Sequence, residues 1–254
     1  MAQRLTGKTA MITGGAGGIG AATGRLFCEE GASVLLVDRD AAACQAAVEE
    51  IARHADGSRV AFAKLDVARE SAAAEAVSIA LDRFGRLDCL INNAAIRSYE
   101  PLAEAKSETW RDVLAVNLLS YAFFARAALP ALRQSGSGSI VNVASTYGVN
   151  MRAGMGQYDA TKAGIISMTR TLAAEETRNG VRVNAVCPGF TLTPFHIRRA
   201  KDADQLRTEH RPECLIGRWA DPREIAYPIL WLASAEASYM TAAVIMADGG
   251  MPIS

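Results

Sequence analysis

A glycine-rich run separates the first apolar segment of this 254-residue chain from its first helical segment. The run reads Thr13-Gly14-Gly15-Ala16-Gly17-Gly18-Ile19-Gly20 and directly follows a β-branched stretch. Glycines at a strand-to-helix turn let the backbone approach a pyrophosphate, which rests on the free N–H groups of the helix N-terminus. A turn that is merely rich in glycine is the alternative interpretation. The position between a predicted strand and a predicted helix favours a dinucleotide site.

The same run fits two motifs that share one glycine. Gly15, Gly17 and Gly20 match G-x-G-x-x-G, and Thr13, Gly14, Gly18 and Gly20 match T-G-x-x-x-G-x-G. The sequence does not decide between these two registers.

Short β-branched runs alternate with longer alanine-rich segments along most of the chain. The predicted strands are Thr9–Thr13, Ser33–Asp38, Arg59–Leu65, Leu87–Asn92, Ser139–Ser145, Val181–Cys187 and Ala243–Ala247. The predicted helices are about Gly18–Glu30, Ala41–His54, Ser71–Phe84, Ser107–Leu132, Gln157–Asn179 and Pro222–Ala233. Strands that are apolar throughout and alternate with helices are typical of a parallel sheet covered on both faces. We therefore predict an α/β fold: a single Rossmann-type doubly wound domain over residues 1–254, with a seven-stranded, mostly parallel sheet.

The segment from about 190 to 220 interrupts this alternation. It has prolines at 194 and 212, many charges and no clear hydrophobic period. It follows a predicted strand, at the sheet edge where α/β proteins bind their ligands. We interpret it as a substrate loop, because a long loop at that place is usually functional.

Charge and composition exclude several classes of function. Twenty-seven basic and 27 acidic residues give a formal net charge of zero, so we expect neither nucleic acid nor a membrane as a partner. The apolar stretch 225–233 is too short to span a bilayer, and the N-terminal segment lacks the apolar core of a secretory signal. Five scattered cysteines and three histidines without metal-ligand spacing favour a cytoplasmic location and no metal site.

The second predicted strand ends in an acidic residue that bears on cofactor choice. Asp38 lies 18 residues after Gly20. A carboxylate at this spacing accepts hydrogen bonds from the adenosine ribose hydroxyls and repels a 2′-phosphate. Arg39 is the competing signal, since an arginine there can pair with that phosphate. We expect NAD rather than NADP, because a carboxylate beside a dianion is unfavourable wherever Arg39 points.

Tyr158 and Lys162 lie one helical turn apart on one face of a predicted helix. An ordinary phenol is a poor base at neutral pH, and a nearby cation favours the phenolate. The pair alone is compatible with an ordinary helix surface. Its meaning depends on what else the sequence places around it.

Taken together, these motifs resemble the short-chain dehydrogenase/reductase family of NAD(P)-dependent enzymes, over Thr13 to Gly250. The glycine run matches the cofactor motif of that family in the second register, T-G-x-x-x-G-x-G. The resemblance implies catalytic roles for Asn117, Ser145, Tyr158 and Lys162, with Ser145 13 residues before Tyr158. It implies cofactor contacts from Gly14, Gly17, Gly18, Ile19, Gly20, Asp38, Arg39, Asp66, Val67, Asn93, Ala94, Tyr158, Lys162, Pro188, Gly189, Thr191 and Thr193. It also implies a homotetramer.

The resemblance assigns a task to each catalytic residue. In oxidation, Tyr158 removes the hydroxyl proton while hydride leaves carbon for the nicotinamide. Ser145 hydrogen-bonds the reacting oxygen, and Lys162 holds the nicotinamide ribose. Asn117, at a distortion of its helix, holds a water that relays protons; a core-satisfying amide is the alternative.

Two positions depart from the family pattern. Ala95 stands where glycine is usual, and the methyl group is tolerated unless the backbone needs a positive φ there. Thr191 stands where an aliphatic residue is usual, and we expect its backbone contact to persist.

The residues expected to bind substrate are Arg97, Ser145, Tyr147, Arg152 and His196. Arg97, Arg152 and Arg198 all fall in segments predicted to form the pocket. One hypothesis is that one of them holds an anionic or strongly polar substrate. The alternative is that they are solvated or paired with Glu100, Asp202 or Asp204.

The sequence therefore predicts an NAD-dependent oxidoreductase that interconverts a secondary alcohol and a ketone, with a sugar-like or cyclic polyol as the substrate type. Two alternatives stay open. One is an NADPH-dependent reductase of the 3-oxoacyl-carrier-protein type, and the other is a non-catalytic dinucleotide-binding relative.

Overall fold

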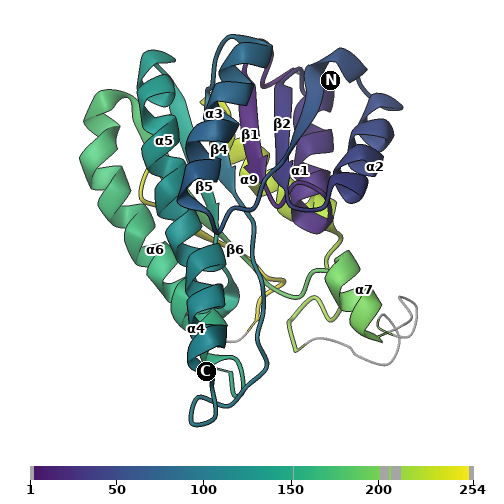
Figure 1. Cartoon of the computed structure of the whole chain (residues 1–254), viewed down its shortest axis with the longest axis vertical. Helices are drawn as coiled ribbons and strands as arrows, with labels where there is room; N and C mark the ends of the chain where they lie inside the picture. Colours follow the sequence, from purple (N-terminus) through teal and green to yellow (C-terminus); the bar gives the residue numbers. More distant parts are fainter. Residues whose placement is uncertain (1–2, 151, 201–205, 207–212, 252–254) are drawn as a thin grey trace.

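Seven parallel strands form one sheet in the order β3-β2-β1-β4-β5-β6-β7. The computed structural model describes residues 3–150, 152–200, 206 and 213–251 (Figure 1). The strands are β1 (Thr9–Thr13), β2 (Ser33–Asp38), β3 (Val60–Lys64), β4 (Cys89–Asn92), β5 (Gly138–Val143), β6 (Val181–Pro188) and β7 (Val244–Ala247). Every pairing among them is parallel, so the predicted doubly wound sheet is confirmed.

Helices cover both faces of the sheet. They are α1 (Gly18–Glu29), α2 (Ala41–Ala52), α3 (Glu70–Phe84), α4 (Ser107–Leu114), α5 (Ser120–Gln134), α6 (Gly156–Glu176), α7 (Pro194–Ala200) and α9 (Pro222–Ala233). One apolar core joins the sheet to α3, α5 and α6, and a second joins it to α1, α2 and α9. The central strands are buried on both sides, which explains their uninterrupted apolar sequence.

The order of strands reverses direction between the neighbouring strands β1 and β4, so the chain continues away from their carboxyl ends in opposite directions. Chains leaving those ends move to opposite faces of the sheet and leave a crevice between them, where α/β proteins bind ligands. Figure 1 shows α7 below this edge of the sheet, beside the loop that leads to α4.

Two elements differ from the sequence-based expectation. The helix predicted over Ser107–Leu132 is continuous through Gln134, but α4 and α5 are joined by the π-helical turn Ala115–Leu119. In the segment predicted as a loop, α7 begins at Pro194, whose fixed φ suits a first helical turn. Residues 201–205 and 207–212 of that segment lie outside the described part of the chain.

Among the described residues, one helix is long and apolar enough to cross a membrane by length and composition, over Ser107–Gln134. In this fold its apolar face packs on the sheet, with Tyr121, Phe124 and Leu132 fully buried. A core helix passes the same test, so the finding is weak evidence for a membrane span.

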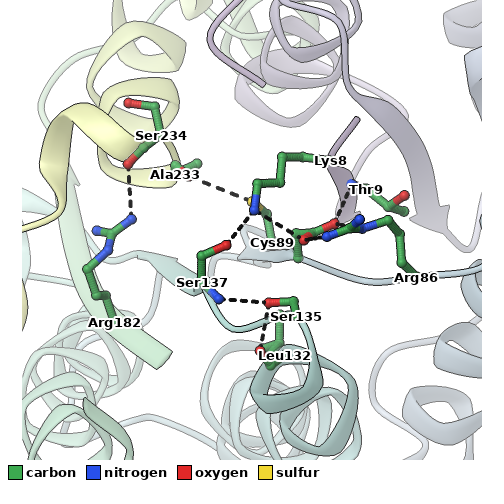
Figure 2. Close-up of polar contacts among 11 residues, drawn as sticks. Lys8, Thr9, Arg86, Cys89, Leu132, Ser135, Ser137, Arg182, Ala233 and Ser234 are labelled. Atoms are coloured by element: carbon green, nitrogen blue, oxygen red, sulfur yellow. Dashed lines mark hydrogen bonds and ion pairs between the residues drawn. The ribbon is translucent and has the colours of Figure 1, made fainter. Parts of the chain in front are cut away.

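A buried carboxylate organises the opposite, amino-terminal edge of the sheet. Asp88 accepts hydrogen bonds from Arg86 at 2.6 and 2.7 Å and from the Thr9 amide at 2.9 Å. The Lys8 ammonium lies 3.4 Å away. Figure 2 shows Lys8, Thr9 and Arg86 gathered in this region, with their polar contacts as dashed lines. Burial by itself raises the pKa of Asp88, but these donors outweigh it and hold the pKa below its usual range.

Replacing Asp88 by Asn is expected to lower the free energy of unfolding at neutral pH by about 2–3 kcal/mol, because cationic partners lose their buried counter-charge. A carboxylate with a depressed pKa stabilises the fold above its unfolded pKa of about 4, and this contribution is lost as the pH falls through the folded value. The wild type should therefore lose more stability than D88N between neutral pH and about pH 3. Urea unfolding at both pH values measures this.

Glu70→Gln is the matched control, because Glu70 and its partner Arg126 are both exposed. Such a surface pair contributes less than about 1 kcal/mol. Equal effects of D88N and E70Q would contradict a special role for Asp88.

Candidate active site

A cavity of about 620 Å³ opens at the carboxyl ends of the strands. The predicted site residues that line it are Gly14, Gly17, Gly18, Ile19, Asp38, Arg39, Asp66, Val67, Asn93, Ala94, Arg97, Ser145, Tyr158, Lys162, Pro188, Gly189, Thr191, Thr193 and His196. Gly20, Asn117, Tyr147 and Arg152 are not among the lining residues. The structure thus brings both the predicted cofactor residues and most of the predicted catalytic residues to one space.

The glycine turn adopts the second of the two possible registers. Gly14 and Gly18 have positive φ values of 64° and 54°, a conformation that side chains strain. At Gly20 an added Cβ would lie only 2.1 Å from the Gly14 carbonyl oxygen. T-G-x-x-x-G-x-G is therefore the motif that the backbone requires, and Gly20 acts by close packing rather than by lining the cavity.

Polar contacts from β4 fix the shape of this turn. The Asn93 side-chain amide donates to the Thr13 and Gly14 carbonyl oxygens at 3.0 and 3.1 Å. The Thr13 hydroxyl in turn accepts from the Asn93 backbone amide at 2.9 Å. The Asn93 side chain, just after the neighbouring strand β4, thus holds the carbonyl oxygens of the turn in place.

The N-terminus of α1 suits an anion. Its N-cap residue, Gly17, supplies no side-chain cap, and the first turn holds no acidic residue. A Cβ at Gly17 would meet nothing nearer than the Pro194 ring at 3.8 Å, so the backbone there is open to a ligand. Uncapped first-turn N–H groups and the helix dipole favour negative charge, and a dinucleotide pyrophosphate fits this cradle.

Asp38 lies at the end of β2 and points back to the glycine turn. Its carboxylate accepts from the Ala16 amide and from the Asp40 amide, each at 3.3 Å. Arg39 is exposed and forms no ion pair among the described residues. Asp66 and Val67 also line the cavity. Asp66 is exposed and offers a polar contact, while Val67 is buried and offers an apolar one.

Lys162 is almost fully buried and held in one position. Its Nζ donates to the Val143 carbonyl oxygen at 2.8 Å and lies 5.5 Å from the ring centroids of Tyr121 and Tyr158. Burial, with a smaller contribution from the Arg97 charge, lowers the pKa of Lys162 to about 7. The Tyr121 hydroxyl donates to the same carbonyl oxygen at 3.0 Å. Val143 and Tyr121 were absent from the sequence prediction, since Val143 acts through its backbone, which leaves no sequence signal.

Ser145 and Tyr158 are each 5% exposed and line the cavity together. Ser145 follows β5, and its hydroxyl oxygen accepts from the Tyr147 amide at 3.1 Å, so its hydrogen stays available to another acceptor. Tyr158 lies in the first turn of α6, one turn before Lys162. The arrangement places a hydroxyl donor, a phenol and an ammonium around one space.

Asn117 lies in the π-helical turn, so the predicted helix distortion is confirmed. Its side chain accepts from the Ile96 amide at 2.8 Å and donates to the Ile96 carbonyl oxygen at 2.9 Å. It is fully buried and also lies 3.4 Å from the Thr161 hydroxyl. The amide therefore ties the loop after β4 to the long helix and to α6, as the core-satisfying alternative requires.

The chain after β6 closes the cavity on a third side. An added Cβ at Gly189 would lie 2.7 Å from the Asp248 Cα, so this segment passes close to the C-terminal strand. Thr191 is buried and pairs by its backbone with Ala220. The backbone contact expected between Thr191 and the cofactor stays a prediction. Ala95 does not adopt a positive φ, so its extra methyl group is tolerated as predicted.

The arginines predicted at the pocket have different partners. Arg152 donates to Asp159 at 3.0 Å and stacks on the Tyr147 ring with its Cζ 3.5 Å from the centroid. Arg97 has no carboxylate partner among the described residues; its Nη1 contacts His196 Nε2 at 2.8 Å. Asp202 and Asp204, the other expected partners, lie outside the described residues.

Comparisons with known proteins agree with this geometry. A family model described as enoyl-(acyl carrier protein) reductase matches residues 14–252. The chain is 38% identical to 2,5-dichloro-2,5-cyclohexadiene-1,4-diol dehydrogenase LinX of Sphingobium indicum, over 100% of this chain and 99% of that protein. It is also 38% identical to 3-oxoacyl-[acyl-carrier-protein] reductase FabG of Thermotoga maritima, over 98% and 100% of the two chains.

A solved structure gives the same result for the fold. L-sorbose reductase from Gluconobacter frateurii, complexed with NADPH and L-sorbose, superposes with a TM-score of 0.93 at 32% identity, over 99% of this chain and 98% of that one. Fold, glycine turn and sequence similarity over the full length agree. The chain belongs to the short-chain dehydrogenase/reductase family of oxidoreductases.

Proposed function

We propose that this protein is an NAD-dependent dehydrogenase that interconverts a secondary alcohol and a ketone, with Tyr158 as the general acid and base. The observation that carries the proposal is the convergence of Ser145, Tyr158 and Lys162 on the cavity that the uncapped N-terminus of α1 also faces. That space holds a proton-transfer group beside a cradle for a dinucleotide.

The residues of the chain divide the chemistry between them. When bound, a nicotinamide dinucleotide supplies the acceptor or donor of the hydride. Tyr158 takes the hydroxyl proton in oxidation and returns it in reduction. Ser145 donates a hydrogen bond to the reacting oxygen. Lys162, with its pKa lowered to about 7, is a cation that releases and regains a proton readily near neutral pH.

The proposed preference for NAD is supported by Asp38. Replacing Asp38 by Asn removes the charge that opposes a 2′-phosphate and retains a hydrogen-bonding side chain. We expect D38N to tighten NADPH binding by about 10-fold or more and to weaken NADH binding by about 5- to 10-fold. Fluorescence titration of each variant with both nucleotides measures this.

Arg39→Gln separates the two charges in the same titration. If Asp38 is the selector, R39Q leaves NADH binding within about 2-fold of the wild type. A large loss of NADPH binding in R39Q, with no gain of NADPH binding in D38N, would show that Arg39 and not Asp38 sets the preference between the two nucleotides.

The substrate class that we propose is a secondary alcohol on a ring or a sugar-like chain, in keeping with the names of the similar dehydrogenase and sorbose reductase. The test is NAD reduction by a panel of cyclic and acyclic secondary alcohols, with primary alcohols of the same carbon number as controls. Turnover of secondary alcohols alone supports the proposal. Turnover of no alcohol by a protein that binds NADH would contradict it and favour the non-catalytic alternative.

A reductase that works with NADPH is the second candidate. It is favoured by Arg39 in the cavity wall and by the similarity to FabG. NADPH oxidation with an acetoacetyl thioester, exceeding every rate with NAD and an alcohol, would favour this candidate.

A further inference from the structure

Charge is distributed unevenly along the wall of the cavity. The carboxylates among the described lining residues, Asp38, Asp40 and Asp66, lie at or just after the ends of β2 and β3. One cation, Arg39, lies beside them, while Arg97, Lys162 and Arg198 lie on segments after β4, β5 and β6. Because β2 and β3 lie on one side of the switch point and β4 to β6 on the other, the catalytic end of the cavity is the positive end.

Arg97 is a cation at that end whose position is fixed without an ion pair among the described residues. Its Cζ lies 5.3 Å from the ring centroid of Tyr158 and 5.2 Å from that of Phe195. Its polar contact, at 2.8 Å, is with His196 Nε2. Guanidinium groups only donate, so Nε2 accepts and the ring proton lies on Nδ1, which faces the Thr193 hydroxyl at 3.0 Å. This contact of Arg97 is therefore with a ring nitrogen and not with a carboxylate, and its remaining N–H groups have no acceptor among the described residues.

Arg152, in the same region, forms an ion pair. Its Cζ lies 5.9 Å from the Tyr158 ring centroid, and its guanidinium is paired with the Asp159 carboxylate at 3.0 Å. Arg97 forms no such ion pair among the described residues. Its charge acts at longer range: it lowers the pKa of Asp159, against the larger raising effect of burial, and it contributes to the lowered pKa of Lys162. The positive charges of Arg97 and Lys162 beside one cavity repel each other, and an anion bound in the cavity reduces this repulsion.

We propose that the substrate carries a carboxylate close to its reacting carbon, and that Arg97 binds this carboxylate. This inference rests on the proposed function and narrows its substrate class to hydroxy acids and their keto counterparts. Arg97 offers a planar fork of donors that matches a carboxylate in two parallel hydrogen bonds. Its distance from the Tyr158 ring requires that carboxylate and hydroxyl lie only a few bonds apart. His196 is a positioning residue, because its contact with Nη1 holds the Arg97 guanidinium beside the Tyr158 ring.

Matched substrate pairs test the proposal. Each pair is a short hydroxy acid and its carboxamide, which has the same shape without the charge: the hydroxypentanoates with a secondary hydroxyl, and the ring hydroxycyclohexanecarboxylates. We expect the wild type to prefer the best acid over its carboxamide by about 100-fold in kcat/KM. Arg97→Met should lower kcat/KM for the acid by about 100-fold and for the carboxamide by less than about 3-fold. Arg97→Lys should restore part of the loss, because it keeps the charge without the fork.

Arg53→Met is the control for the loss of one positive charge, since Arg53 is an exposed residue directly after α2 and does not line the cavity. An equal loss on acid and carboxamide in R97M would overturn the proposal and make Arg97 a structural residue. A wild type that prefers the carboxamides would overturn it as well, while leaving the proposed dehydrogenase function intact.

A binding measurement decides the matter without turnover. The complex of the protein with NADH is titrated with pentanoate and with pentanamide, neither of which can be reduced, and the nucleotide fluorescence is followed. We expect pentanoate to bind about 10-fold more tightly than pentanamide to the wild type and no more tightly to R97M. Equal binding of both by the wild type overturns the proposal, even if the enzyme oxidises neutral secondary alcohols.

Discussion

Replacement of Tyr158 by Phe is expected to lower kcat by about 10³- to 10⁴-fold and to leave NADH binding within about 2-fold of the wild type. The substitution removes one oxygen from a side chain that is 5% exposed, so the fold and the cavity wall stay in place. What is lost is the group that accepts the hydroxyl proton in oxidation. Ser145 cannot replace it, because a hydroxyl without a neighbouring base holds its proton too strongly at neutral pH.

Two further phenols make this prediction specific. Tyr239 is fully exposed, so Tyr239→Phe is the control that should keep full activity. Tyr147 lies beside Ser145 but stacks under Arg152 and does not line the cavity. A loss of kcat in Y147F that equals the loss in Y158F would contradict the assignment of the proton-transfer role to Tyr158 alone.

Replacement of Lys162 by Met is expected to abolish turnover, by about 10³-fold or more, while raising the free energy of unfolding at neutral pH by about 1–3 kcal/mol. Burial of the ammonium lowers the pKa of Lys162 to about 7, which means that folding works against the charged form. The methionine side chain fills similar space without a charge. The Val143 carbonyl oxygen keeps the Tyr121 hydroxyl as its donor, so no buried acceptor is left unpaired.

The pH dependence of the free energy of unfolding tests whether burial of the Lys162 ammonium is the cause of this gain in stability. Between the folded pKa of about 7 and an unfolded value of about 10.4, the unfolded chain binds more protons at this residue than the folded chain does. Wild-type stability therefore gains a contribution as the pH rises through that window, and K162M lacks it. Urea unfolding at about pH 7 and about pH 9.5 measures the difference. Lys64→Met, at an exposed lysine of β3, is the control. A lower stability of K162M at both pH values would show that the ammonium stabilises the fold.

The fold was predictable because its signals are local and repeated. Apolar β-branched runs between alanine-rich segments predicted all seven strands of the sheet within a few residues. The register of the glycine turn was not predictable from glycine spacing, because both motifs share Gly20. The family resemblance implied the second register, and the positive φ of Gly14 and Gly18 agrees with it. The helix α7 was missed because a short amphipathic turn among charges has no clear period.

Site residues divide in the same way. Asp38 was predicted from its place at a strand end, whereas Tyr158 and Lys162 drew attention by their spacing and received their roles from the family resemblance. The difference between Arg97 and Arg152 was not predictable, since it depends on which side chain Asp159 meets in three dimensions. Tyr121 and the Val143 carbonyl escaped notice because long-range packing, and not sequence spacing, brings them to Lys162. The homotetramer, the cytoplasmic location and the single domain stay predictions.

The most direct measurement is a fluorescence titration of the unmodified protein with NADH and, separately, with NADPH, since it requires no substrate. We expect both to report binding at the cavity and NADH to bind at least about 10-fold more tightly, because Asp38 opposes a 2′-phosphate. Tighter binding of NADPH would contradict the role of Asp38 and favour a reductase. Binding of neither nucleotide would contradict the assignment of the glycine turn and the α1 N-terminus as a dinucleotide cradle.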